Sequence, residues 1–101
     1  AVRLVPSRRS LRNGEAVRFS GRLAGAPAGA GKLVEIQAHF RGRWRTFATI
    51  GAGADGRFAY TYRFGATVGR VSYRFRAVAR REAGYPYETG VSPVVRVTVT
   101  G

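Results

Sequence analysis

A chain of 101 residues, of which 45 % are hydrophobic, is long enough to form one packed domain and too short for two. The absence of cysteine excludes disulfides, thiol catalysis and thiolate metal sites. Eighteen basic residues against five acidic ones give a formal net charge of +13, and every basic residue except Lys32 is an arginine. Guanidinium groups suit carboxylates, phosphates and sulfates, so the charge favours anionic partners.

Apolar residues alternate with polar ones along most of the chain, and this period of two predicts β-strands. In chain order the expected strands cover residues 2–5, 15–23, 33–40, 44–50, 57–64, 71–77 and 95–100. The strand at 44–50 alternates poorly, which indicates a bulge or an edge position. Asn13-Gly14 and Asp55-Gly56 mark turns, because both pairs tolerate a positive φ.

Strands with one apolar and one polar face predict two sheets packed face to face. Seven short strands with turns every ~8–12 residues favour an immunoglobulin-like β-sandwich of about seven antiparallel strands, formed as a single domain by residues 1–101. The alternation places large rings inside: Phe58, Tyr60, Tyr62, Phe64, Tyr73 and Phe75. It places arginines outside both sheets: Arg18, Arg22, Arg57 and Arg63 on one, and Arg74, Arg76 and Arg96 on the other.

Several segments resemble bacterial immunoglobulin-like modules of secreted and surface proteins, especially those of actinobacteria. The likeness is carried by KLVEIQ at 32–37, GRWRTF at 42–47, DGRF at 55–58, YRFRA at 73–77, YPY at 85–87 and VRVTV at 95–99. It implies a module that occurs in tandem or attached to other domains, as a spacer, an adhesin stalk or a carbohydrate-contacting accessory. No isopeptide bond is expected, because the last strand offers Lys32 no Asn or Asp partner, and a solitary Asp55 does not suit calcium.

No motif in the sequence combines the residue types that catalysis requires. His39 falls on the outward parity of its strand, and a lone histidine cannot make a zinc site. The five acids are scattered over Glu15, Glu35, Asp55, Glu82 and Glu88. We therefore predict no catalytic residue, no metal ligand and no cofactor, and expect the chain not to be an enzyme.

Six residues are candidates for contact with a ligand or partner: Trp44, Arg74, Arg76, Tyr85, Tyr87 and Arg96. Trp44 is either a core residue or a platform on which a sugar stacks. The two tyrosines flank Pro86 in the loop before the last strand, where they either pack locally or bind. The arginines form either a solubilising coat that protects the sheet edges or a contact with a diffuse polyanion such as an acidic polysaccharide. Nucleic acid is disfavoured, because it calls for exposed aromatics beside the cations.

The chain contains no methionine, even at position 1, so we expect a processed product or a piece of a longer protein. No apolar stretch approaches the roughly 20 residues of a membrane span. With the resemblance, this favours an extracellular or cell-surface location.

Two hypotheses for function follow. The first is a non-catalytic structural module: a stalk, a spacer or a fibre subunit whose partners are neighbouring modules or copies of itself, joined by strand exchange in a homopolymer. The second is a binding module for an anionic glycan or cell-wall polymer that uses surface arginines and loop aromatics.

Overall fold

The computed structural model describes residues 2–23, 32–53, 55–79 and 90–101, apart from the side chain of Phe40. The described residues form strands and turns, without a helix. The strands are β1 (Val2–Pro6), β2 (Ser10–Arg12), β3 (Ala16–Leu23), β4 (Leu33–Phe40), β5 (Arg43–Gly51), β6 (Arg57–Arg63), β7 (Arg70–Ala79), β8 (Gly90–Val91) and β9 (Val95–Thr100). The small sheet has the order β1-β3-β6. The large sheet has the order β2-β9-β7-β4-β5, with β8 paired to β7.

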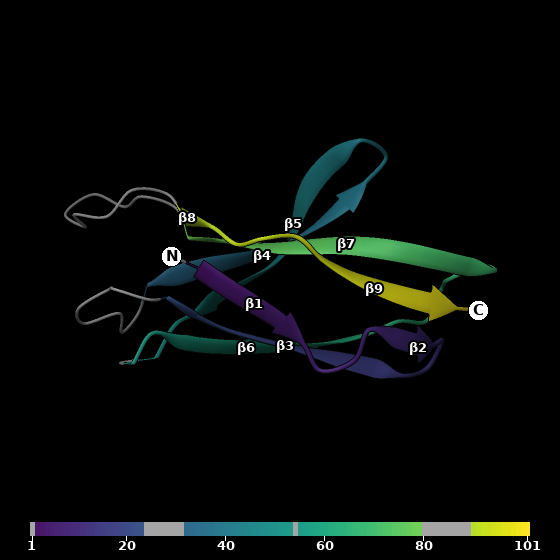
Figure 1. Cartoon of the computed structure of the whole chain (residues 1–101), viewed down its shortest axis with the longest axis horizontal. Helices are drawn as coiled ribbons and strands as arrows, with labels where there is room; N and C mark the ends of the chain where they lie inside the picture. The colour runs from purple at the N-terminus through teal and green to yellow at the C-terminus, as the bar shows by residue number, and fades with distance from the viewer. Residues whose placement is uncertain (1, 24–31, 54, 80–89) are drawn as a thin grey trace.

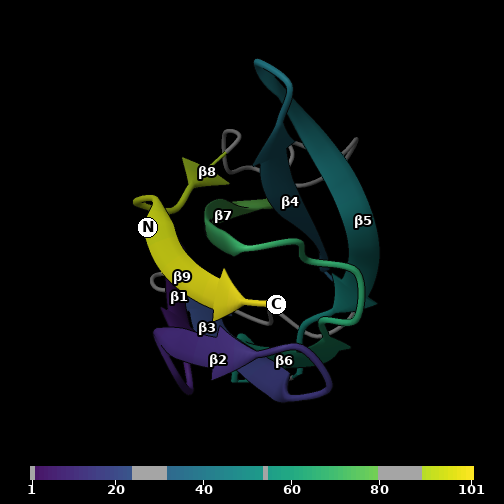
Figure 2. The ribbon, with the colours of Figure 1, turned by 90° about the vertical axis from the view of Figure 1, so that its right-hand side faces the viewer.

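The two sheets pack face to face (Figure 1), which confirms the prediction of an all-β chain in two layers. Figure 2 shows β3 and β6 of the small sheet below β4 and β7 of the large sheet. The β4–β5 hairpin projects beyond the body of the sandwich in both views. The N-terminal end of β1 and the C-terminal end of β9 lie apart along the longest axis (Figure 1).

The prediction of about seven antiparallel strands is wrong in number and in one pairing. The ladder of β1 with β3 ends at Pro6, which has no N–H to donate. The chain then crosses to the large sheet, where β2 pairs with β9 in parallel. Strands β2 and β8 have only three and two residues, so they are too short for alternation to mark them.

The buried faces are those that alternation predicted. The largest side chains with almost no exposure are Phe19, Ile36, Val17, Val34, Val97 and Val99, which come from both sheets. The rings of Phe19 and Phe75 join the sheets at a centroid distance of 4.7 Å. Every arginine expected outside either sheet is exposed except Arg76, which is half-buried on the outer face. Of the expected inner rings, Phe58, Phe64 and Phe75 are buried, Tyr60 and Tyr73 are half-buried, and Tyr62 remains 37 % exposed.

The turns contain the positive φ angles that the sequence requires. Gly14 and Gly56 have φ of 92° and 80°, as Asn13-Gly14 and Asp55-Gly56 predicted. Between β4 and β5, Arg41 and Gly42 have φ of 50° and 78°, so this two-residue turn is of the type in which both central residues are left-handed. Arg41 has a Cβ that disfavours this region, whereas asparagine tolerates it.

Replacing Arg41 by asparagine is therefore expected to raise the free energy of unfolding by about 0.5–1 kcal/mol. Gly42→Ala is the matched control, and it should lower the free energy of unfolding by about 1 kcal/mol because alanine is strained at positive φ. Urea unfolding of the two variants measures both changes. A loss of stability in Arg41→Asn would contradict the assigned turn.

Candidate functional site

The outer face of the large sheet brings together four of the six predicted contact residues. Arg74 of β7 is directly opposite Arg96 of β9, and Arg76 of β7 is opposite Gln37 of β4. Trp44 of β5 is opposite His39, two residues beyond Gln37 on β4. Because residues paired across a sheet share a face, Trp44, Arg74, Arg76 and Arg96 all lie on this surface.

Trp44 packs against two polar side chains on this surface. The guanidinium carbon of Arg76 lies 4.2 Å from the centroid of its ring. The imidazole of His39 meets the indole edge-on, at a centroid distance of 5.1 Å. The indole is half-buried by these neighbours, and it presents an aromatic surface beside a cation.

The alternative that Trp44 is a core residue is wrong, and a β-bulge is the reason. The register of β4 with β5 shifts after Ile36, so that Ala48 is opposite Ile36 and Thr46 is opposite Gln37. Phe47 is the additional residue. Its ring packs on those of Tyr60 and Phe75 between the sheets. The extra residue reverses the parity of the strand, and Trp44 turns outward.

A chain of hydrogen bonds fixes the position of Arg76. Its Nε donates to Oε1 of Gln37 at 2.8 Å, and Nε2 of Gln37 donates to the hydroxyl of Thr46 at 3.1 Å. The Thr46 hydroxyl donates to Oε1 of Glu35 at 2.6 Å. Gln37 is only 4 % exposed, so its amide depends on these partners. Arg76 is therefore held in one orientation over Trp44.

Sequence reasoning did not single out Gln37 and Thr46, although the outward parity of residues 35, 37 and 39 on one strand was a usable signal. The predicted contacts Tyr85 and Tyr87 lie outside the described residues.

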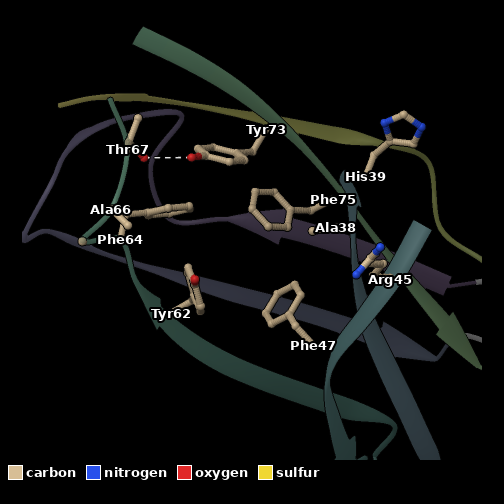
Figure 3. Close-up of a pocket in the computed structure, with 11 residues that line it drawn as sticks. Ala38, His39, Arg45, Phe47, Tyr62, Phe64, Ala66, Thr67, Tyr73 and Phe75 are labelled. Carbon is tan, nitrogen blue, oxygen red and sulfur yellow. Dashed lines mark hydrogen bonds between the residues drawn. The ribbon is translucent and has the colours of Figure 1, made fainter. Parts of the chain in front are cut away.

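A second feature is a cavity of about 500 Å³ between the sheets (Figure 3). Its wall contains the rings of Phe47, Tyr62, Phe64, Tyr73 and Phe75. The Phe64 and Tyr73 rings are stacked at 5.3 Å, and the Tyr73 hydroxyl is 2.8 Å from that of Thr67.

The cavity lies where β5 and β6, the edge strands of their sheets, face each other. Arg45, which is exposed, also lines it. Its volume and apolar wall suit an aromatic or apolar group of small-molecule size. Alternation predicted that the rings of Tyr62, Phe64, Tyr73 and Phe75 point inward, but not that of Phe47, and it cannot predict whether the opposite sheet covers them.

Within the described part of the chain, His and acidic side chains form no group of three or more that could hold a metal ion. Every buried polar side-chain atom there has a hydrogen-bond partner.

Comparison with family models, with curated proteins and with solved structures gave no match. Among the described residues there is no helix with the length and hydropathy needed to cross a membrane.

Replacing Arg76 by alanine is expected to lower the free energy of unfolding by about 1–2 kcal/mol, because it removes the cation over Trp44 and leaves Oε1 of the buried Gln37 side chain without its donor. The variant should also make Trp44, the single tryptophan, more accessible to acrylamide quenching. Arg74→Ala on the same strand is the matched control, with an expected change below about 0.5 kcal/mol. Equal losses in the two variants would contradict the assigned contacts.

Proposed function

We propose that the chain is a non-catalytic, immunoglobulin-like structural module of an extracellular or cell-surface protein, placed as a stalk, spacer or fibre subunit between neighbouring modules or copies of itself. The order of the strands supports this class. Lettered along the chain, β1, β3 and β6 correspond to strands A, B and E, while β4, β7 and β9 correspond to C, F and G. Immunoglobulin-type sandwiches group A, B and E in one sheet and C, F and G in the other.

Two core contacts also agree with this class. In antibody domains a disulfide joins strands B and F, and here the Phe19 and Phe75 rings join the corresponding β3 and β7. Those domains also have a tyrosine two residues before the second cysteine, with its hydroxyl bonded to the backbone a few residues upstream. Tyr73 is likewise two residues before Phe75, and its hydroxyl bonds upstream to the side-chain hydroxyl of Thr67 rather than to the backbone.

The observation that carries the mechanical part of the proposal is the parallel pairing of the first and last strands of the large sheet. The N–H of Thr98 donates to the carbonyl of Arg9 at 2.8 Å, and the N–H of Asn13 donates to the carbonyl of Thr100 at 3.0 Å. Because β2 and β9 are parallel, forces on the two ends of the chain pull them in opposite directions along their axes. The hydrogen bonds are then loaded together in shear rather than opened one after another.

Single-molecule pulling tests this proposal. Force applied at the two ends of the chain should unfold the module at a clearly higher force than force applied through Leu33→Cys and Gly51→Cys. Those residues are opposite each other at the open end of the β4–β5 hairpin, so the second geometry unzips one ladder bond at a time. Equal forces in the two geometries would contradict a load-bearing role.

The second candidate is a binding module for an anionic glycan or cell-wall polymer. It is favoured by the shared face of Trp44, Arg74, Arg76 and Arg96, since a guanidinium beside an indole can hold an acidic group and an adjoining sugar ring together.

If this candidate is right, Trp44 fluorescence should change on addition of polygalacturonate at 20 mM salt and lose most of that response at 500 mM salt, because exposed ion contacts are screened. Neutral dextran is the control and should give no response. A response to both polymers, or one unaffected by salt, would contradict recognition through the arginines.

A further inference from the structure

The outer face of the small sheet has a row of arginines that crosses all three of its strands. Arg3 of β1 is opposite Arg22 of β3, and Arg22 is opposite Arg57 of β6. All three are exposed. The Cβ atoms of directly opposite residues are about 4.5–5.5 Å apart, and like charges in such pairs destabilise a sheet. The row therefore lowers the free energy of unfolding relative to three neutral residues at the same positions.

Little negative charge offsets this row in the described part of the chain. Nε of Arg57 lies 3.4 Å from Oδ2 of Asp55, and both side chains are largely exposed, so this pair contributes little. No acidic side chain of the described residues forms an ion pair with Arg3 or Arg22. Among the described residues, Asp55 is therefore the one acid that pairs with the row, and the three arginines together keep a net positive charge.

The row borders a hollow with a floor of small side chains. The next row of the sheet consists of Val5, Ser20 and Ala59, which are opposite one another on the same three strands. Arg18 stands on the far side of this floor, two residues from Ser20 on the same outward face. All seven of these residues line one hollow of about 670 Å³ that is widely open to solvent.

We propose that this hollow binds an acidic polysaccharide, with its carboxylate or sulfate groups on the arginines and its sugar rings over the Val5–Ser20–Ala59 floor. Guanidinium forks match carboxylates and sulfates in pairs of parallel hydrogen bonds. Phe58 also lines the hollow, but it is only 5 % exposed and so offers little surface on which a nucleic-acid base could stack. The inference depends on the second candidate above for the class of polymer, but it places the contact on the opposite face of the sandwich.

The test compares three variants of the whole chain by isothermal titration with polygalacturonate and with dextran sulfate. Arg3→Gln/Arg22→Gln/Arg57→Gln removes the row. Arg9→Gln/Arg43→Gln/Arg70→Gln is the matched control, because it removes the same charge from exposed arginines outside the hollow. Arg74→Gln/Arg96→Gln removes two arginines from the outer face of the large sheet.

Loss of the row should weaken binding at least about tenfold, the equivalent of one charge-assisted hydrogen bond, and the matched control should change it less than about threefold. Equal losses in these two variants would show a response to net charge alone and would overturn the proposal. A loss confined to the large-sheet variant would also overturn it, while leaving the second candidate function intact. Tighter binding of oligo-dT than of either polysaccharide would overturn the choice of polymer.

A stability measurement tests the row without depending on one polymer. At low salt and without polymer, Arg22→Gln should raise the melting temperature by about 2–5 °C, because it relieves two like-charge contacts. Polygalacturonate should stabilise the native chain more than the variant without the row. A lower melting temperature for Arg22→Gln would show that the row is not repulsive, and equal stabilisation of both proteins by the polymer would show that the row does not bind it.

Discussion

The contact of aromatic rings between the sheets is the interaction on which the rest of the structure depends. The chain has no cysteine, so no disulfide joins its two layers. Instead Phe75 meets Phe19 at 4.7 Å, and it also meets Phe47 and Phe64 at 5.9 and 6.2 Å. Rings of this size bury large apolar areas, so their strands have one acceptable orientation. Because these residues must point inward, the arginines beside them must point outward.

The two outer faces use their arginines differently. On the large sheet, Gln37 and Trp44 hold Arg76 in one orientation, and the guanidinium becomes part of a packed surface. On the small sheet, Arg3, Arg22 and Arg57 stand opposite one another above small side chains. A solubilising coat does not require such a register, since dispersed charge serves solubility as well and costs less stability. Surfaces that give up stability in this way are typical of binding regions.

Much of this arrangement could be predicted from the sequence, because alternation of period two depends only on the local geometry of a strand. It placed Phe64 and Phe75 inside, the arginines outside and the turns at Gly14 and Gly56. It failed at β2 and β8, which are too short to show a period. It could not predict whether Trp44 lies on the inner or the outer face of the sheet, because the position of the bulge at Phe47 depends on the register of β5 with β4.

Features that depend on pairing or packing between strands from different parts of the chain could not be predicted from the sequence either. The Arg3–Arg22–Arg57 row requires the register of β1, β3 and β6, which alternation along a single strand does not contain. The aromatic cavity depends on how far β5 and β6 stand apart. Both features are properties of pairing and packing between strands.

The central claim is that the inward rings, with one bulge in β5, determine which side chains reach solvent. Thiol labelling of single-cysteine variants tests it directly, because the chain has no cysteine of its own. Residues 46, 48 and 50 have the same parity, yet only the first is on the outer face. The account predicts fast labelling of Thr46→Cys and slow labelling of Ala48→Cys and Ile50→Cys. Equal rates at all three positions would mean that β5 has no bulge and that Trp44 is on the inner face, which would contradict the account.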